Sequence, residues 1–259
     1  MSNSHDPDDL FIYTLGSILI DYTLCEKDLG INTVPKLSWV EHTDILYSRA
    51  NQRLGMLKRN CSFVSNLRKR RALYLSQIRS QFEHCPIIWR PASKTSIDKL
   101  ESIQKRGFKW ILNIFSGFSS TAFYYHTCKQ LDILPISIRF DLKDLVYFHD
   151  IFYDLSIVKL PSYLSRFQGT SLRKCHLDHL CVQSSIHPKT PQNLENEISQ
   201  TGISKSFFYR AHSAWNRLPF DIRKIVSPAS FKSTLTKYLW KEALALATLP
   251  SDLIDELSE

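Results

Sequence analysis

The spacing of hydrophobic residues predicts helices over most of the chain. From Ser38 onward, apolar residues recur mostly every three or four positions, which is the period of one buried helix face. The positions of this first stripe are Val40, Leu46, Ala50, Leu54, Leu57 and Cys61. Ser38 and Glu41 have the spacing of a capping box, so we expect the helix to begin at Ser38. A second stripe, from about Ser65 to Cys85, consists of Ala72, Leu75, Ile78 and Phe82.

Five more helical patterns follow. The third helix is expected to run from residue 96 or 97 to about 114, after Pro86 and Pro91 break the chain. The next begins near Phe123, and residues 138–155 form another after the interruption at Pro135. The segments SFFYRAHSAWNRLP and FKSTLTKYLWKEALALA predict the last two helices, the final one capped by Ser230.

Extended segments are expected only near the N-terminus and in one later loop. FIYTL and ILIDYTL, joined at Gly16 and Ser17, predict a hairpin, and KDLGI reads as a further extended piece with a bend at Gly30. Between 161 and 203 the periodicity fades into Ser, Thr, Pro and Gln, so we expect a long irregular loop, with short strands at SLRKCHL and HLCVQSSI.

The expected fold is therefore mainly α, a helical bundle with a small N-terminal β-hairpin and a long irregular loop before the C-terminal helices. The predicted organisation is a disordered N-terminus (1–10), the hairpin region (11–36), a basic helical domain (37–160), the loop or linker (161–203), a C-terminal helical segment (204–248) and an acidic tail (249–259).

Positive charge is concentrated in the middle of the chain. Residues 49–109 contain 15 lysines and arginines and three acidic residues, a net charge of +12, whereas the whole chain carries +8. Arginines dominate the NLRKRR cluster, where they oppose the dipole at a helix N-terminus, and arginine binds phosphate in bidentate fashion. We therefore expect contact with a polyanion. The candidate nucleic-acid-binding residues are Lys27, Arg49, Arg53, Lys58, Arg59, Arg68, Lys69, Arg70, Arg71, Lys105, Arg106 and Lys109.

Other chemistries find weaker support. Six scattered cysteines without a secretory signal indicate an intracellular protein, nuclear or cytoplasmic, and the longest apolar run is too short to cross a bilayer. Neither a metal nor another cofactor is expected. The residues nearest to a zinc pattern do not have the spacing of a finger or knuckle; they are Cys175, His176, His179, Cys181 and His187. The five tryptophans lie in or beside apolar stripes and are expected in the core rather than as base-stacking platforms.

An ordered series of motifs carries a family resemblance. It comprises KDLGI, LSW followed by His42, ANQRLGMLKR, LYLSQIRSQFEHCPIIWRP, LESIQKRGFKWIL, CKQLDILPISIRFDLKDL, LPSYLSRF, SFFYRAHSAWNRLP and SFKSTLTKYL. Between about Tyr13 and Lys241 the chain resembles the C-terminal part of a non-LTR retrotransposon reverse transcriptase of the jockey type, that is, its primer grip, its thumb and the region after the thumb.

The resemblance implies a polymerase part without its catalytic centre. Lys27, Asp28, Leu29 and Gly30 match the family's primer-grip turn, and helices 38–60 and 66–85 match the thumb, which packs on the primer–template duplex. The family's Tyr-x-Asp-Asp motif does not occur, and Asp8 and Asp9 lack the flanking strands of a two-metal site. We expect no enzymatic activity. The expected partners are RNA or DNA, bound through phosphate contacts, and a separate polymerase palm. A helical protein-interaction or structural module and a non-functional relic remain alternatives, and the oligomeric state stays open.

Overall fold

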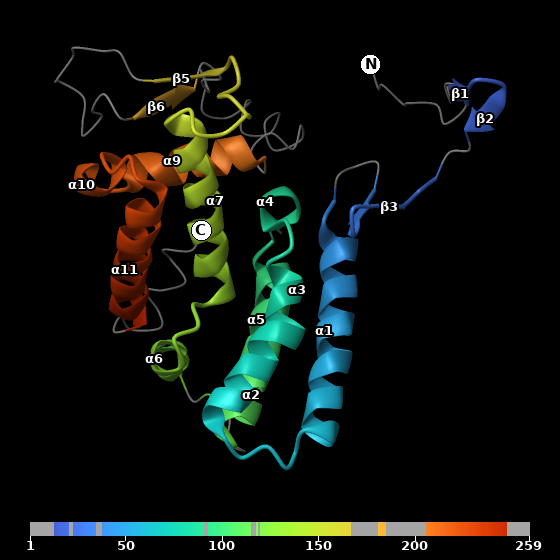
Figure 1. Ribbon diagram of the computed structural model, residues 1–259, viewed down its shortest axis with the longest axis vertical. Coiled ribbons are helices and arrows are strands. Elements are labelled where there is room, and N and C mark those ends of the chain that lie inside the picture. Colours follow the sequence, from blue (N-terminus) through green and yellow to red (C-terminus); the bar gives the residue numbers. More distant parts are fainter. Residues whose placement is uncertain are drawn as a thin grey trace, which may run out of the picture.

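The chain folds mainly into helices, as the hydrophobic periodicity predicts. The computed structural model describes residues 13–20, 23–34, 38–90, 93–114, 118, 120–166, 181–184 and 206–247. The predicted N-terminal segment 1–10, the acidic tail 249–259 and most of the loop 161–203 lie outside these residues. Figure 1 shows a row of helices with two small hairpins at one side.

Three long helical segments form the first half of the body. They are α1 (Val40–Asn60), the segment from α2 (Leu67–Tyr74) to α3 (Ser80–Phe82), and α5 (Lys94–Leu112), with the single turn α4 (Pro86–Trp89) between the last two. In α1 the predicted stripe is buried at its four central positions, Leu46, Ala50, Leu54 and Leu57. The predicted stripe therefore marks the face of α1 that packs against the core.

The predicted capping box at the start of α1 is wrong. Trp39 is the N-cap, and its side chain makes no capping hydrogen bond. Thr43 Oγ1 instead donates to the carbonyl oxygen of Trp39 at 2.7 Å. Val40 is half exposed, whereas His42 and Thr43 in the same turn are buried.

A π-helical segment interrupts the second helix. The segment η1 (Leu75–Arg79) connects α2 to α3 without a break in the helical rod. Its carbonyl at Gln77 accepts hydrogen bonds from Arg53 Nη1 at 3.2 Å and from Gln81 Nε2 at 2.8 Å. The wider turn moves the buried stripe to Tyr74, Ile78 and Phe82, so the predicted position Ala72 is exposed.

The second half of the body packs around α7 (Ile136–Phe152). Its neighbours are α6 (Thr121–Leu131), α9 (Phe207–Arg217), α10 (Phe220–Arg223) and α11 (Pro228–Ala247). A single buried cluster extends from α1 to α11 and includes Trp89 and Trp215, which are both fully buried. Trp110 and Trp240 are also buried and Trp39 is partly buried, which confirms their expected place in the core.

Short antiparallel hairpins complete the fold. β1 (Tyr13–Leu15) pairs with β2 (Ile18–Ile20) as predicted, and Gly16 has a positive φ of 64° in the turn. The predicted bend at Gly30 is a full hairpin of β3 (Glu26–Asp28) and β4 (Ile31–Thr33). Near the C-terminal helices, β5 (Leu164–Arg166) pairs with β6 (Val182–Ser184). The strand expected at SLRKCHL lies outside the described residues.

Candidate nucleic-acid interface

The predicted cations occupy a segment without acidic residues. Between Asp44 and Glu83 the sequence has nine lysines and arginines and no aspartate or glutamate. Six of the nine are exposed on α1, α2 and near the connection between them, namely Arg49, Arg53, Lys58, Arg59, Arg68 and Lys69. None of the six forms an ion pair with an acidic side chain that the structure describes.

The exposed residues of α1 form one stripe along the helix. Arg49, Arg53, Met56 and Arg59 follow one another at three- and four-residue steps, with Gln52 beside them, on a side away from the buried stripe. Ten residues of helix cover about 15 Å. After the connection that follows α1, Arg68 and Lys69 lie exposed in the first turn of α2, so both helices carry exposed cations.

Arg70 and Arg71 bind backbone carbonyls of the protein, Arg70 as a buried side chain and Arg71 as a partly exposed one that also pairs with Asp132. Arg70 donates to the carbonyl of Val64, and through Nη1 to the carbonyl of Trp110 at 2.9 Å. Arg71 Nε donates to the carbonyl of Leu131 at 2.6 Å. These carbonyls at 110 and 131 belong to the last turns of α5 and α6, where helical partners are lacking. The two arginines cap helix C-termini, and we omit them from the phosphate-binding set.

The cations of α5 are also partly engaged within the protein. Arg106 Nη1 donates to Asn51 Oδ1 at 2.8 Å, and its guanidinium lies over the ring of Tyr47. Lys105 Nζ lies 5.0 Å from the ring centre of Tyr124. Lys109 is half-buried. These three candidates are therefore less accessible than the cations of α1 and α2.

The turn Lys27–Gly30, which the resemblance matches to a primer grip, is fixed to the helices near the N-terminal end of α1. Leu29 and Gly30 both have positive φ, 45° and 88°, as a tight two-residue hairpin turn requires. His84 Nε2 lies 2.9 Å from the carbonyl oxygen of Leu29. Lys27, Asp28, Leu29 and Gly30 are all exposed. Figure 1 shows this hairpin and the α1–α2 connection at opposite ends of α1, so Lys27 lies away from the main group of cations.

His42 of α1 binds the same hairpin through a hydrogen bond. Its Nδ1 accepts a hydrogen bond from the backbone N–H of Asn32 at 3.1 Å, which requires an unprotonated Nδ1. Burial, together with the positive charges of Arg49 and His84, lowers the pKa of His42 to about 4. The ring also packs edge-on against Trp89. The hairpin therefore depends on a neutral histidine.

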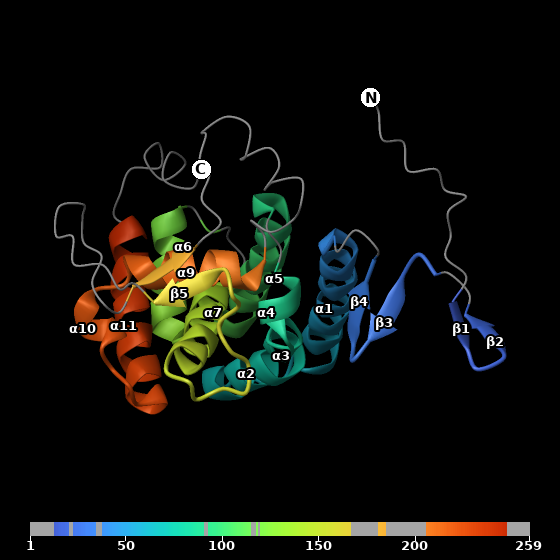
Figure 2. The ribbon, with the colours of Figure 1, turned by 90° about the horizontal axis from the view of Figure 1, so that it is seen from above.

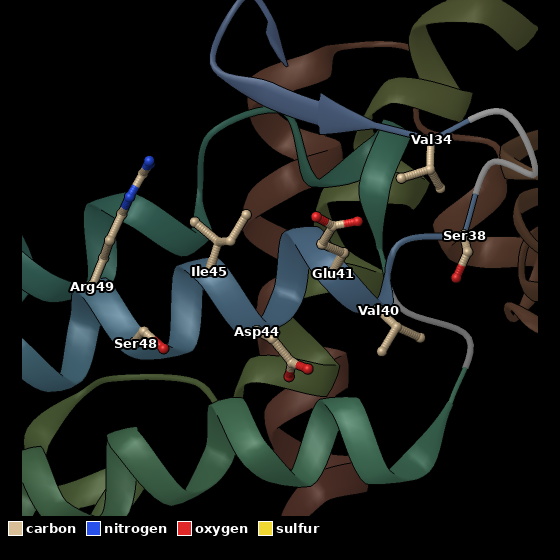
Figure 3. A pocket seen from close by; sticks show the side chains of 8 residues that line it. All are labelled: Val34, Ser38, Val40, Glu41, Asp44, Ile45, Ser48 and Arg49. Atoms are coloured by element: carbon tan, nitrogen blue, oxygen red, sulfur yellow. The ribbon is translucent and has the colours of Figure 1, made fainter. Parts of the chain in front are cut away.

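A shallow groove lies between this hairpin and the exposed side of α1. Its lining includes Val34 and residues of the first half of α1. Figure 3 shows Glu41 and Asp44 among its side chains, with Arg49 at the opposite end from Ser38. Asp44 accepts a hydrogen bond from Lys99 Nζ at 2.6 Å. Because two carboxylates line the groove, the positive surface begins at Arg49 and continues away from the groove.

The most perturbed titratable groups form a buried network, away from this surface. Glu101 accepts hydrogen bonds from the Tyr124 hydroxyl and from the N–H of Ile136 at 2.7 Å, at the start of α7. Burial raises the pKa of Glu101, against the opposing effect of these hydrogen bonds. Gln104 Nε2 donates to the Tyr124 oxygen at 2.9 Å, and Arg79 donates to Gln104 Oε1. Since these groups satisfy one another, the network links η1, α5, α6 and α7 structurally.

A second buried cluster fixes the C-terminal helices, which sequence reasoning missed. Asp144 is 2% exposed and accepts from Arg90 Nη1 at 2.9 Å and from Arg210 Nε at 2.7 Å. Arg210 also donates to the carbonyl of Ile87 at 2.6 Å. The segment SFFYRAHSAWNRLP, whose role the sequence leaves undefined, thus contributes a core helix tied to α4 and α7. The signal available in the sequence was Arg210 within an aromatic helix.

No metal site occurs among the described residues. No three His, Cys, Asp or Glu side chains converge there as metal ligands do. Of the zinc candidates, Cys175, His176, His179 and His187 lie outside the described residues, whereas Cys181 is buried against Arg223. Burial raises the pKa of the Cys128 thiol to about 12. No described helix is both long enough and apolar enough to traverse a bilayer.

Comparison with known proteins gives no relative for this chain. No family model matches its sequence, and no curated protein or solved structure matches it either.

Proposed function

We propose that this chain is a thumb-like nucleic-acid-binding unit related to the jockey-type reverse transcriptases, without polymerase activity of its own. The observation that carries the proposal is the group of six exposed cations within the acid-free segment, none of them paired with a described carboxylate. Such a surface attracts phosphates and repels other cations. The stripe on α1 carries arginines spaced along one helix face, which suits a phosphate backbone rather than the reading of base edges.

Binding is tested by titrating labelled RNA and DNA, duplex and single-stranded, with the purified chain at several salt concentrations. If all six cations meet phosphates, the slope of log affinity against log salt is about −5 on duplex DNA. Replacing Arg49, Arg53 and Arg59 by alanine weakens binding and makes the slope shallower. The matched control replaces Lys232, Lys237 and Lys241, three exposed lysines of α11, and leaves binding nearly unchanged. Absence of binding at low salt refutes the proposal.

The lack of polymerase activity rests on the sequence, which contains no Tyr-x-Asp-Asp tetrapeptide. A primed template incubated with the chain, nucleotides and Mg²⁺ is then not extended. Extension by the purified chain contradicts this part of the proposal, and a nuclease-free preparation is the necessary control.

A protein partner such as a polymerase palm is a second candidate, favoured by the β1–β2 hairpin. Leu15, Ile18 and Leu19 are 75%, 71% and 63% exposed, and Figure 2 shows this hairpin apart from the helices. Contiguous exposed apolar side chains of this kind are typical of an interaction surface. Replacing Ile18 and Leu19 by serine is expected to abolish association with a palm-containing partner without changing the melting temperature of the chain. Unaltered association contradicts the assignment.

A further inference from the structure

The connection between α1 and α2 presents an aromatic ring to solvent among the exposed cations. Phe63 is 82% exposed, whereas the next most exposed phenylalanines with described side chains, Phe220 and Phe123, are 42% and 41% exposed. Phe220 lies under Lys224 and Phe123 packs against Phe118. Phe63 makes no ring contact with the described residues. Phosphate binding alone gives no reason for an apolar ring in this place.

The backbone on either side of Phe63 is held in place. Val64 N–H donates to the carbonyl of Cys61 at 3.2 Å, and the carbonyl of Val64 accepts from the guanidinium of Arg70. Asn66 caps α2 through a hydrogen bond from Lys69 N–H at 3.1 Å. The ring is therefore presented by an ordered turn, which lowers the entropy lost when it meets a ligand.

Charge surrounds the ring on both sides. Lys58 and Arg59 end α1 and Arg68 and Lys69 begin α2, all exposed, and no acidic residue lies between Asp44 and Glu83. A ligand for this place must combine negative charge with a flat or apolar surface. A single-stranded nucleic acid has both, because its phosphates meet the cations while an unpaired base offers a face to stack on. A duplex hides these faces except at its ends.

We infer that the α1–α2 turn binds single-stranded nucleic acid by stacking a base on Phe63 between the flanking cations. This inference rests on the proposed nucleic-acid binding and names a preferred form of it. An anionic membrane surface also combines charge with apolar contact. The single strand is favoured because the turn offers one aromatic ring on a fixed backbone, whereas membrane-bound helices present a continuous apolar face.

The test compares an oligothymidylate with an abasic oligomer of the same length and charge. The wild-type chain is expected to bind the oligothymidylate about 5- to 100-fold more tightly. Phe63→Ala and Phe63→Leu remove this preference, Phe63→Trp keeps it, and all three leave duplex binding unchanged. The control Ile157→Ala removes a side chain that is 99% exposed on a different segment and keeps the preference.

Each contrary result has a distinct meaning. Equal binding of the two oligomers by the wild-type chain overturns the stacking inference, while retained salt-dependent duplex binding leaves the proposed function standing. Lack of binding to all nucleic acids overturns both. Binding to phosphatidylserine vesicles that is lost in Phe63→Ala and kept in Phe63→Leu, without a preference between the oligomers, overturns the inference in favour of a membrane surface.

Discussion

Two adjacent pairs of cations on α2 meet opposite environments. Arg68 and Lys69 are exposed in the first turn, whereas Arg70 and Arg71 reach carbonyls at the ends of α5 and α6. The four residues are consecutive and chemically alike. Their difference teaches that the charge of a segment does not measure its capacity to bind phosphate, since a helix directs successive side chains to different sides.

The same contrast holds for the whole molecule. At the α1–α2 end, cations without acidic partners among the described residues surround an exposed ring. At the junction of α4, α7 and α9, the guanidinium groups of Arg90 and Arg210 share the buried carboxylate of Asp144. The cations of the first region are available to an external anion. In the second region Asp144 of the chain itself neutralises the arginines. Mutations in the two regions should therefore separate binding from stability.

The largest effect is expected at the buried junction. Asp144→Ala removes the buried carboxylate that Arg90 and Arg210 share, although Arg90 keeps its ion pair with Asp141. The free energy of unfolding should fall by about 3 kcal/mol. Chemical denaturation measures the change. The matched control is Asp221→Ala, which removes a carboxylate paired with Lys224 at an exposed site and costs at most about 1 kcal/mol. Equal losses in the two variants would show that Asp144 has no special role.

A smaller effect separates the two pairs on α2. Arg70→Ala leaves the carbonyls of Val64 and Trp110 without their donor and is expected to cost about 1–3 kcal/mol of unfolding free energy. Arg68→Ala changes an exposed side chain and should stay within about 0.5 kcal/mol of the wild type. Thermal and urea unfolding of the two variants decide the comparison. A stable Arg70→Ala protein would contradict the capping role.

For the salt dependence of nucleic-acid binding we expect the reverse order: the exposed Arg68 and Lys69 should matter more than the carbonyl-bound arginines that follow them. Replacing Arg68 and Lys69 together by alanine should reduce the slope of log affinity against log salt by about 2, because each lost phosphate contact contributes about 0.9. Arg71→Ala should leave the slope near that of the wild type when the folded fraction is corrected for. Duplex titrations at four or more salt concentrations provide the measurement. A slope that responds equally to both changes would remove the distinction.

The last effect depends on pH and concerns the hairpin end of α1. His42 has a pKa of about 4 in the folded chain and an ordinary value of 6.5, so the unfolded chain binds more protons between these pH values. Stability should fall as the pH is lowered from about 6.5 toward 4. His42→Gln should flatten that part of the stability profile relative to the wild type. Parallel profiles would show that His42 titrates normally.

Local pattern predicted the helices and the buried face of α1, because periodicity depends on neighbours three and four residues apart. It did not predict the direction of Arg70 and Arg71, whose acceptors lie 40 and 60 residues away in the sequence. The capping box at Ser38 failed for a related reason, since the contacts of the hairpin and of Trp39 fix where α1 begins. Nor could the sequence separate the six exposed cations of α1 and α2 from candidates such as Arg70 and Arg106 that contact other parts of the protein.

The π-helical segment Leu75–Arg79 also constrains how this chain is aligned or redesigned. It accommodates an extra residue, so a helical wheel drawn through α2 and α3 as one ideal helix assigns the wrong face to everything after it. Forcing the same residues into one ideal α-helix would rotate those after the segment by about 100° relative to α2. Glu83 would then leave Arg139, and His84 would leave the Leu29 carbonyl. The register of a single helix thus determines whether the hairpin at the far end of α1 stays attached.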